Sequence, residues 1–143
     1  FLQLNKTFIV EYNKRRYNAD LFPNVHNMLK KIISTGVTLS ILSASHQNTL
    51  WDLTKYYLID QYFNTISGVD NYIADGKIIN GHKLIENLNL NNKEIVLIGD
   101  TDHDYEVANN LNIDCVLVSH GHQSSDRLKR ISNNVIDSLN VLL

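Results

Sequence analysis

The chain has 143 residues, of which 43% are hydrophobic and 20% are charged, a balance typical of one globular domain. The formal net charge of −2 provides no basic surface for a phosphate backbone, so we expect no nucleic-acid partner. No apolar run approaches the roughly 20 residues of a membrane span, and we expect neither a membrane partner nor a secretory signal. Cys115 is the only cysteine, which excludes an intrachain disulfide and indicates a cytoplasmic protein.

Helical and extended patterns alternate through most of the chain. Apolar residues at spacings of three and four predict helices over residues 1–17, 22–36, 46–58, 83–90, 102–111 and 124–130. A tail begins at residues 135–136 and is predicted to end in a last helix that runs to residue 143. Short β-branched and aliphatic runs predict strands over residues 37–42, 62–67, 94–98 and 115–119. Residues 72–73 and 77–79 are candidates for small strands on either side of a turn at Asp75 and Gly76. The alternation predicts an α/β fold in a single domain over residues 1–143, a Rossmann-like parallel sheet with helices on both faces.

The most informative stretch covers residues 94–104. A buried strand is predicted to end at Ile98, and the missing Cβ of Gly99 then leaves the backbone free to turn. Asp100 follows directly, Asp102 stands at the predicted helix N-cap, and Asp104 follows Asp100 by four residues. Carboxylates at the carboxyl end of a strand lie where open α/β sheets bind ligands, and hard oxygen ligands suit Mg²⁺. A Gly-Asp pair alone is more often only a turn or a cap, so the other motifs decide its interpretation.

Two further positions fall on the same predicted rim of the sheet. Ser43-Ala44-Ser45 follows the strand over residues 37–42, and a hydroxyl with free backbone N–H groups there can hold a phosphate oxygen. Lys83 opens a predicted short helix, from which its ammonium could neutralise a phosphate and a nearby carboxylate. Each alone is more often a turn residue or a solvated surface charge. Together with Asp100 they would form an electrostatic clamp for phosphoryl transfer.

In their order and strand context, these motifs resemble the haloacid dehalogenase superfamily of phosphohydrolases over about residues 22–136. The resemblance is nearest to the branch that contains phosphoglycolate phosphatase. It implies that Ser43 and Ala44 bind phosphate, and that Lys83 binds phosphate and orients the nucleophile. It also implies that Asp100 binds Mg²⁺ directly and that Asp104 supports the metal.

The same resemblance implies a Mg²⁺-dependent phosphatase that hydrolyses a phosphomonoester of a small metabolite through an aspartyl-phosphate. The nucleophile would be an Asp in an Asp-x-Asp motif after an N-terminal strand, and no such motif precedes Ser43. Asp20 lacks an apolar strand before it, and the pair of Asp100 and Asp102 has no metal motif downstream. The first core strand and most of the helical cap are therefore expected to be absent, with residues 1–17 as a remnant of the cap. We expect this segment alone to be inactive.

The absent strand would be central in such a fold. It would lie between the strand that ends at Leu42 and the strand that ends at Ile98. Without it, two inner strand edges would carry unpaired backbone groups. We expect a second polypeptide, a swapped segment or residues 7–12 to complete the sheet.

Two alternatives come from other classes of protein. The first is a catalytically inactive domain, derived from such a phosphatase, that binds a phosphate group or a protein. The second is a receiver-like or dinucleotide-binding domain, which is disfavoured because the chain has neither an acidic cluster at its start nor a Gly-x-Gly-x-x-Gly motif. The histidines form no complete metal-binding pattern: His103 is predicted to be a surface residue, and His120 and His122 to form a turn.

Overall fold

The computed structural model describes residues 10–70 and 76–142. Residues 10–15 are helical. The helices that follow are α2 (Val25–Ser34), α3 (Gln47–Tyr56), α4 (Gly76–Leu88), α5 (Asp102–Leu111) and α6 (Ser125–Leu128), and the strands are β1 (Ser40–His46), β2 (Thr65–Val69), β3 (Val96–Gly99), β4 (Asp114–Val118) and β5 (Val135–Ile136). Short 3₁₀ helices occur at η1 (Asp60–Tyr62), η2 (Asn92–Glu94) and η3 (Leu139–Leu142). In the part of the chain that the structure describes, no helix has the length and apolar character needed to cross a membrane.

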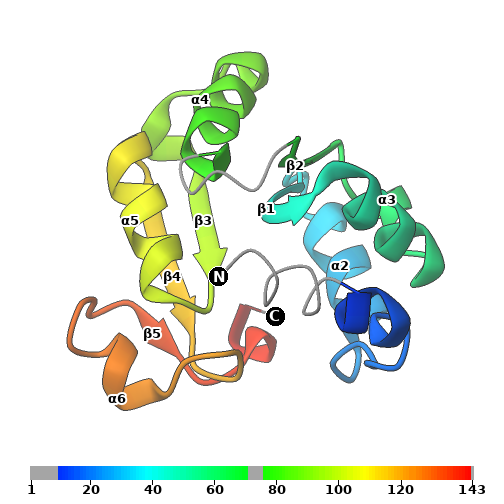
Figure 1. Cartoon of the computed structure of the whole chain (residues 1–143). Helices are drawn as coiled ribbons and strands as arrows, with labels where there is room; N and C mark the ends of the chain where they lie inside the picture. The colour runs from blue at the N-terminus through cyan, green and yellow to red at the C-terminus, as the bar shows by residue number, and fades with distance from the viewer. Residues whose placement is uncertain (1–9, 71–75, 143) are drawn as a thin grey trace.

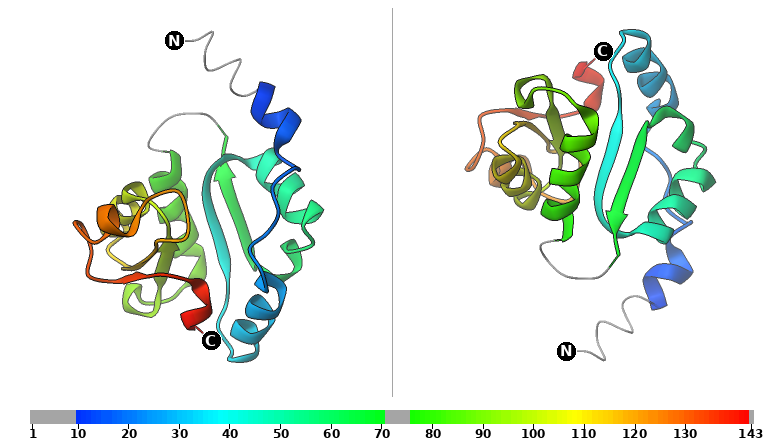
Figure 2. Two further views of the ribbon diagram at one scale, coloured as in Figure 1. Left: turned by 90° about the horizontal axis from the view of Figure 1, so that it is seen from below. Right: turned by 90° about the horizontal axis from the view of Figure 1, so that it is seen from above.

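The strands form two separate parallel sheets, which Figure 1 shows as two halves of the molecule. β1 pairs with β2 from Ser40 opposite Thr65 to His46 opposite Val69, and the register is irregular after Leu42. In the second sheet β4 lies between β3 and β5, again with parallel pairing. Figure 2 shows the first sheet between α3 on one side and α4 on the other, and both helices contact both strands. The predicted parallel α/β fold with helices on both faces is therefore confirmed.

Helix α4 holds the two halves together. It packs against β1 and β2 of the first sheet and against α5 of the second half. Gly81 lies at the centre of this contact, where an added Cβ would stand 2.7 Å from a side-chain carbon of Leu111 and 3.2 Å from one of Leu42. Glycine inside a helix costs about 0.5–1 kcal/mol relative to alanine. The close approach of α4 to both halves explains why the chain has glycine here.

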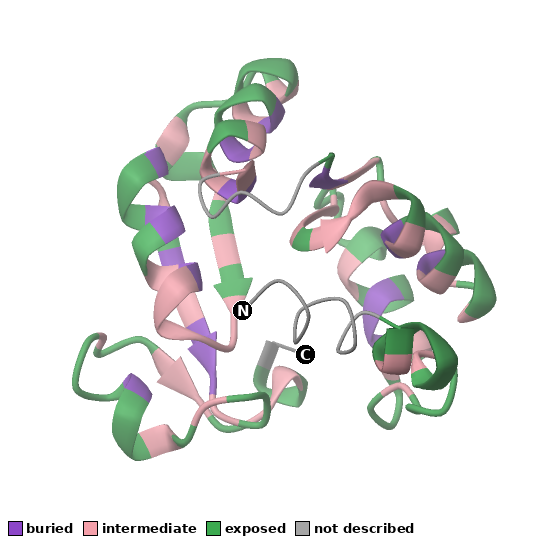
Figure 3. Cartoon of the chain, in the orientation of Figure 1, coloured by how far each residue is buried: buried purple, intermediate pink, exposed green. Residues whose placement is uncertain are grey.

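Buried residues are distributed unevenly over the two sheets and their helices, as Figure 3 shows. The second half contains a buried cluster made of Ala108, Cys115, Leu117 and Leu128. Cys115 is a packed core residue, as predicted, and its burial raises the pKa of its thiol to about 11. By contrast, Val96 and Ile98 of β3 are 52% and 43% exposed although both are apolar. One side of β3 is thus an apolar surface that the described residues leave largely open.

Most predicted elements are present, and α5 has the predicted bounds, but the segment around residue 77 differs. Residues 77–79 are predicted as a small strand and 83–90 as a separate helix, whereas one helix, α4, covers most of both. The prediction of a strand at 77–79 is wrong because the buried positions Lys77, Gly81 and Leu84 follow helical spacing. The candidate strand at 72–73 and residues 1–9 lie outside the described residues.

The C-terminal segment also differs from the prediction. Val135–Ile136 forms β5 and pairs with β4, whereas the sequence indicates only the start of a tail. A strand of two residues is too short to produce an alternating pattern. The last predicted helix is reduced to the 3₁₀ helix at Leu139–Leu142.

A residue in the left-handed conformation follows each of the helices α2 to α5 within two positions of its end. These residues are Gly36, Leu58, Asn89 and Asn112. Leucine is the poorly suited residue among them. Unlike glycine it has a Cβ that approaches a carbonyl oxygen in this conformation, and unlike asparagine it has no short polar side chain that can hydrogen-bond locally. Leu58 is also 64% exposed. We expect Leu58→Gly to raise the free energy of unfolding by about 0.5–1 kcal/mol, since relief of strain outweighs the added chain entropy of glycine. Urea denaturation followed by circular dichroism measures this change.

Asn89→Gly is the matched control, since Asn89 also follows the end of a helix, α4, in the left-handed conformation with φ of 51°. Asparagine already tolerates this conformation, so we expect a change of no more than a few tenths of a kcal/mol. A loss of stability in the Leu58 variant would contradict the account of strain at this helix end.

Candidate active site

The centre of the candidate site is Asp104, a buried residue in the first turn of α5. Thr101 is the N-cap of this helix and forms a capping box with Asp104. Asp104 Oδ2 accepts hydrogen bonds from the backbone N–H groups of Asp100 and Thr101, both at 3.0 Å, and from the Thr101 hydroxyl at 2.7 Å. The carboxylate therefore fixes the turn that joins β3 to α5.

Two expectations for this turn need correction. The N-cap is Thr101 and not Asp102, because the Thr101 hydroxyl accepts the hydrogen bond from the backbone N–H of Asp104 while Asp102 is already helical. Gly99 is needed for packing and not for an unusual backbone angle, since its φ is not positive. A Cβ on Gly99 would overlap the Asp104 side chain, so only glycine lets this carboxylate approach the end of β3.

Lys77, in the first turn of α4, is the lysine that the structure brings to these carboxylates. Its Nζ donates a hydrogen bond to Asp104 Oδ1, and the two side chains are only 10% and 9% exposed. The predicted lysine, Lys83, is exposed on the same helix, about 1.7 turns further along. The signal for Lys77 was present in the sequence, because it shares a helical spacing with Gly81 and Leu84. The incorrect prediction of a strand at 77–79 concealed it.

The Lys77 contact changes the chemistry of Asp104. Burial alone would raise the pKa of the Asp104 carboxyl. The hydrogen bonds from Lys77 and Thr101, together with the positive charge of Lys77, outweigh burial and lower this pKa below its ordinary value. Asp104 is therefore anionic at neutral pH, and it forms a buried ion pair with Lys77.

Asp100 has a different environment at the end of β3. Its side chain is 34% exposed, and its Oδ2 accepts hydrogen bonds from the backbone N–H of His122 at 2.8 Å and from its ring Nδ1 at 2.6 Å. Its Oδ1 accepts no hydrogen bond from the residues that the structure describes. A Cβ on Gly121 would overlap the Asp100 carboxylate, so this approach also requires glycine. His122 lies in the predicted bend, but its contact with Asp100 was not predicted from the sequence.

Asp102 anchors the loop that follows β4. Arg127 donates to its Oδ2 at 2.5 Å and Gln123 Nε2 donates to its Oδ1 at 2.7 Å, while the backbone N–H of Asp102 donates to Gln123 Oε1 at 2.8 Å. The hydrogen bonds from Arg127 and then from Gln123 lower the pKa of the Asp102 carboxyl to about 2. No pattern in the sequence predicts these partners of Asp102.

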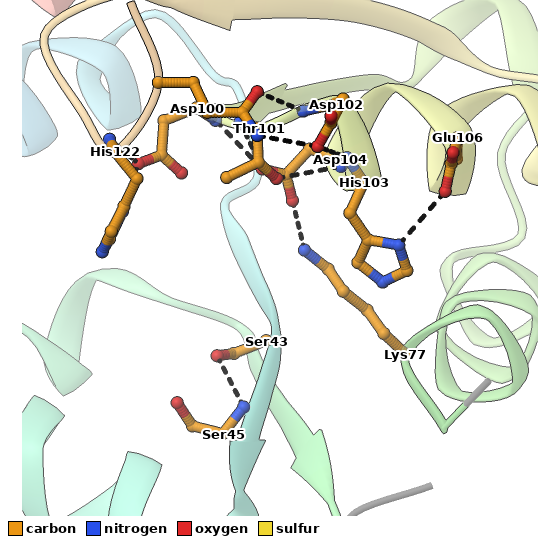
Figure 4. A network of polar contacts seen from close by, with 11 residues as sticks. Ser43, Ser45, Lys77, Asp100, Thr101, Asp102, His103, Asp104, Glu106 and His122 are labelled. Carbon is orange, nitrogen blue, oxygen red and sulfur yellow. Dashed lines mark hydrogen bonds and ion pairs between the residues drawn. The ribbon is translucent and has the colours of Figure 1, made fainter. Parts of the chain in front are cut away.

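Ser43 comes from the other half of the molecule. It lies on β1, where the pairing with β2 is irregular between Leu42 and His46, and its Oγ accepts the backbone N–H of Ser45 at 3.1 Å. The neighbouring Ala44 is exposed. In the view of Figure 4, Ser43 is drawn below Asp100 and the Nζ of Lys77, and no hydrogen bond joins these three side chains to one another. The expectation that Ser43 follows its strand needs correction, because Ser43 lies within β1 directly after the regular pairing ends at Leu42. The carboxylate of Asp100 follows β3, and the ammonium of Lys77 comes from α4.

The donor set at this edge suits Mg²⁺. Asp100 offers a partly exposed carboxylate with one oxygen not engaged by the described residues, whereas both oxygens of Asp104 are taken by protein donors. Mg²⁺ commonly takes one or two carboxylates and completes its shell with water and phosphate oxygens. Within residues 10–70 and 76–142, no cluster of three or more His, Cys, Asp or Glu side chains could hold a metal.

A cavity of about 330 Å³ adjoins Asp100 between α2 and β3. Most of its lining is apolar and includes Val25, Met28, Ile98, Val118 and Leu139. A larger surface hollow of about 640 Å³ is lined by residues such as Arg16 and Tyr57, and it includes none of the site residues described above. The cavity beside Asp100 is therefore the one that bears on the site.

The sequence matches the family model of the haloacid dehalogenase-like hydrolases over residues 2–118. This match covers more than half of the chain, and the chain belongs to the haloacid dehalogenase-like hydrolases.

Particular relatives are distant and longer. The chain is 25% identical over 129 residues to the tyrosine-protein kinase PtkA of Mycobacterium tuberculosis, covering 88% of this chain and 44% of PtkA. It is 24% identical over 117 residues to the 5′-nucleotidase of Pseudomonas aeruginosa, covering 79% of this chain and 52% of that protein. The structure matches that of a predicted phosphoglycolate phosphatase from Haemophilus somnus with a TM-score of 0.81 at 19% identity, covering 96% of this chain and 63% of that chain. The chain thus spans about half the length of these curated relatives.

Replacement of Lys77 tests the importance of the buried ion pair. Lys77→Met would leave Asp104 buried without its counterion, so we expect the free energy of unfolding to fall by about 3–5 kcal/mol. Lys83→Met is the matched control on the same helix, and we expect it to change stability by no more than about 0.5 kcal/mol. Urea denaturation of both variants gives the comparison. Equal stability of the two variants would contradict the assignment of Lys77 to the site.

The depressed pKa values of Asp102 and Asp104 predict an acid-sensitive fold. Each contributes stability that is fully present above the unfolded-state value of about 3.9 and is lost as pH falls through the lower folded-state pKa. We expect the urea concentration at the unfolding midpoint to decrease as the pH is lowered from about 4 to about 2. Asp102→Asn should make this fall less steep, and an unchanged pH profile in that variant would count against the Arg127 and Gln123 contacts.

Proposed function

We propose that these residues form the core of a cytoplasmic, Mg²⁺-dependent phosphomonoester hydrolase that acts on a small phosphorylated metabolite. The reaction would proceed through an aspartyl-phosphate on an Asp that lies outside the 143 residues. The observation that carries the proposal is the Lys77 ammonium held at Asp104, whose other oxygen binds the backbone of Asp100, with Ser43 drawn below this group in Figure 4. A hydroxyl, an ammonium and a metal-binding carboxylate provide the positioning and charge neutralisation that phosphoryl transfer needs.

Each residue has a separate task in this proposal. Ser43 and the adjacent Ala44 hold phosphate oxygens, as the family resemblance implies. Lys77 takes the task predicted for Lys83, since an ammonium has three donors and Asp104 engages its Nζ without exhausting them. Asp100 holds Mg²⁺, and Asp104 supports it by fixing the backbone of Asp100. The metal, when bound, offsets the negative charge of the phosphoryl group being transferred.

We further propose that an additional parallel strand lies between β1 and β3 in the complete protein. Three observations support it: β1 and β3 belong to separate sheets, Val96 and Ile98 are exposed, and an apolar cavity of about 330 Å³ lies between α2 and β3. Such a strand would end beside Asp100 and Ser43, where a nucleophile is needed. A longer polypeptide, a swapped segment or a second chain could supply it, and residues 10–17 would then be the end of a helical cap.

The substrate follows from the class of relatives only in general terms. Of the two relatives described above, one is named a tyrosine-protein kinase and the other a 5′-nucleotidase. Both names refer to phosphoryl chemistry, but they name different substrates. A phosphoglycolate-like metabolite is our proposal for this chain because of the branch that its motifs resemble. The second candidate function is an inactive phosphate-binding or protein-binding domain, which is favoured by the lack of an Asp-x-Asp motif before Ser43.

Hydrolysis of p-nitrophenyl phosphate in Mg²⁺ tests the proposal. The 143-residue chain is compared with a fusion that places in front of it a designed apolar strand ending in an Asp-x-Asp motif, the element that the family resemblance implies. We expect no turnover from the chain alone and Mg²⁺-dependent turnover from the fusion. Lys77→Met in the fusion should reduce turnover by about 100-fold or more, and Lys83→Met should not.

The fusion with its nucleophilic Asp replaced by Asn is the control for contaminating phosphatase. Turnover by the chain alone would contradict the proposed location of the nucleophile. A fusion that is folded and more stable than the chain but inactive would favour the inactive binding domain instead.

A further inference from the structure

The loop of residues 119–123, which follows β4, folds back onto the carboxyl end of β3. Within it, His122 is held against Asp100 and Gln123 is held against Asp102 by the hydrogen bonds described above. Gly121 makes this possible, because any Cβ at that position would overlap the Asp100 carboxylate. The loop therefore contacts both partly exposed carboxylates of the turn between β3 and α5.

The contact of His122 with Asp100 is selective for one oxygen. Both donors, the backbone N–H at 2.8 Å and the ring Nδ1 at 2.6 Å, point to Oδ2. An ionised carboxylate only accepts hydrogen bonds, so Nδ1 must carry a proton in this contact. Two donors on Oδ2 fix the rotation of the carboxylate and leave Oδ1 as the oxygen available to a ligand.

We propose that His122 is a positioning residue that orients Asp100 so that Oδ1 faces the Mg²⁺ site. This inference rests on the proposed function, because it requires Asp100 to bind the metal. Side chains that hold a metal ligand in place commonly account for 10–100-fold in metal affinity. His122 is suited to such a role because its backbone and its ring act together on the same atom.

The rest of the loop keeps His122 in place. The side-chain amide of Gln123 makes two reciprocal hydrogen bonds with Asp102, at 2.8 and 2.7 Å, and Arg127 of α6 holds the other oxygen of Asp102. The loop is thus fixed next to His122 by bonds that do not involve Asp100. This separates the anchoring of the loop from the orientation of the metal ligand.

The experiment uses Mn²⁺ as a paramagnetic probe of the metal site in the ¹⁵N-labelled 143-residue chain. Broadening of the amide signals of Gly99, Asp100 and Thr101 gives an apparent affinity. We expect broadening in the wild type and its loss in Asp100→Asn. His122→Ala should weaken the affinity by about tenfold or more. His122→Asn, which keeps an N–H donor near the position of Nδ1, should restore a large part of it.

His103→Ala is the matched control, since His103 is another histidine beside this turn whose ring contacts Glu106 and not Asp100. It should change the Mn²⁺ affinity by no more than about twofold. Urea denaturation of each variant gives the structural effect separately. A His122→Ala variant that loses stability but keeps its Mn²⁺ affinity would overturn the positioning role, and so would tighter binding, which would mean that the ring competes with the metal. Equal broadening in the wild type and Asp100→Asn would instead overturn the metal assignment in the proposed function.

Discussion

The buried ion pair between Lys77 and Asp104 is the interaction on which the rest of the structure depends. Lys77 belongs to α4, which packs on both strands of the first sheet, and Asp104 belongs to α5, which packs on the second. The pair therefore ties together two sheets whose strands do not hydrogen-bond to each other. It also places a cation next to the turn that carries Asp100. One contact thus joins the fold to the candidate site.

The three carboxylates within residues 100–104 lie in different surroundings. Asp104 is buried and pairs with a lysine, Asp102 is held by Arg127 and Gln123, and Asp100 keeps one oxygen that no described residue engages. Gly99 and Gly121 allow this crowding, because a Cβ at either would overlap a carboxylate. Of these three carboxylates we therefore propose Asp100 as the direct metal ligand, in keeping with its place at the carboxyl end of β3.

Sequence patterns predicted the parallel α/β fold, the bounds of α5 and the Gly99-Asp100 turn because these depend on local periodicity and on residue types with strong preferences. They failed for Lys77, since Ile78 and Ile79 resemble a strand when the packing of α4 against two halves is unknown. They also could not find His122 as a partner of Asp100, because a contact across 22 residues depends on how the loop after β4 folds back. The irregular register beside Ser43 likewise depends on the pairing of β1 with β2.

The central claim is that Ser43, Lys77 and Asp100 serve one phosphoryl group. Crystals of the chain soaked with tungstate and Mn²⁺ test it most directly, since both ions are easily located by their anomalous scattering. The account predicts one tungstate in contact with the Ser43 hydroxyl and the Lys77 ammonium, with Mn²⁺ bound to Oδ1 of Asp100 beside it. Tungstate bound to Lys83, or the two ions bound at separate faces of the molecule, would contradict the account.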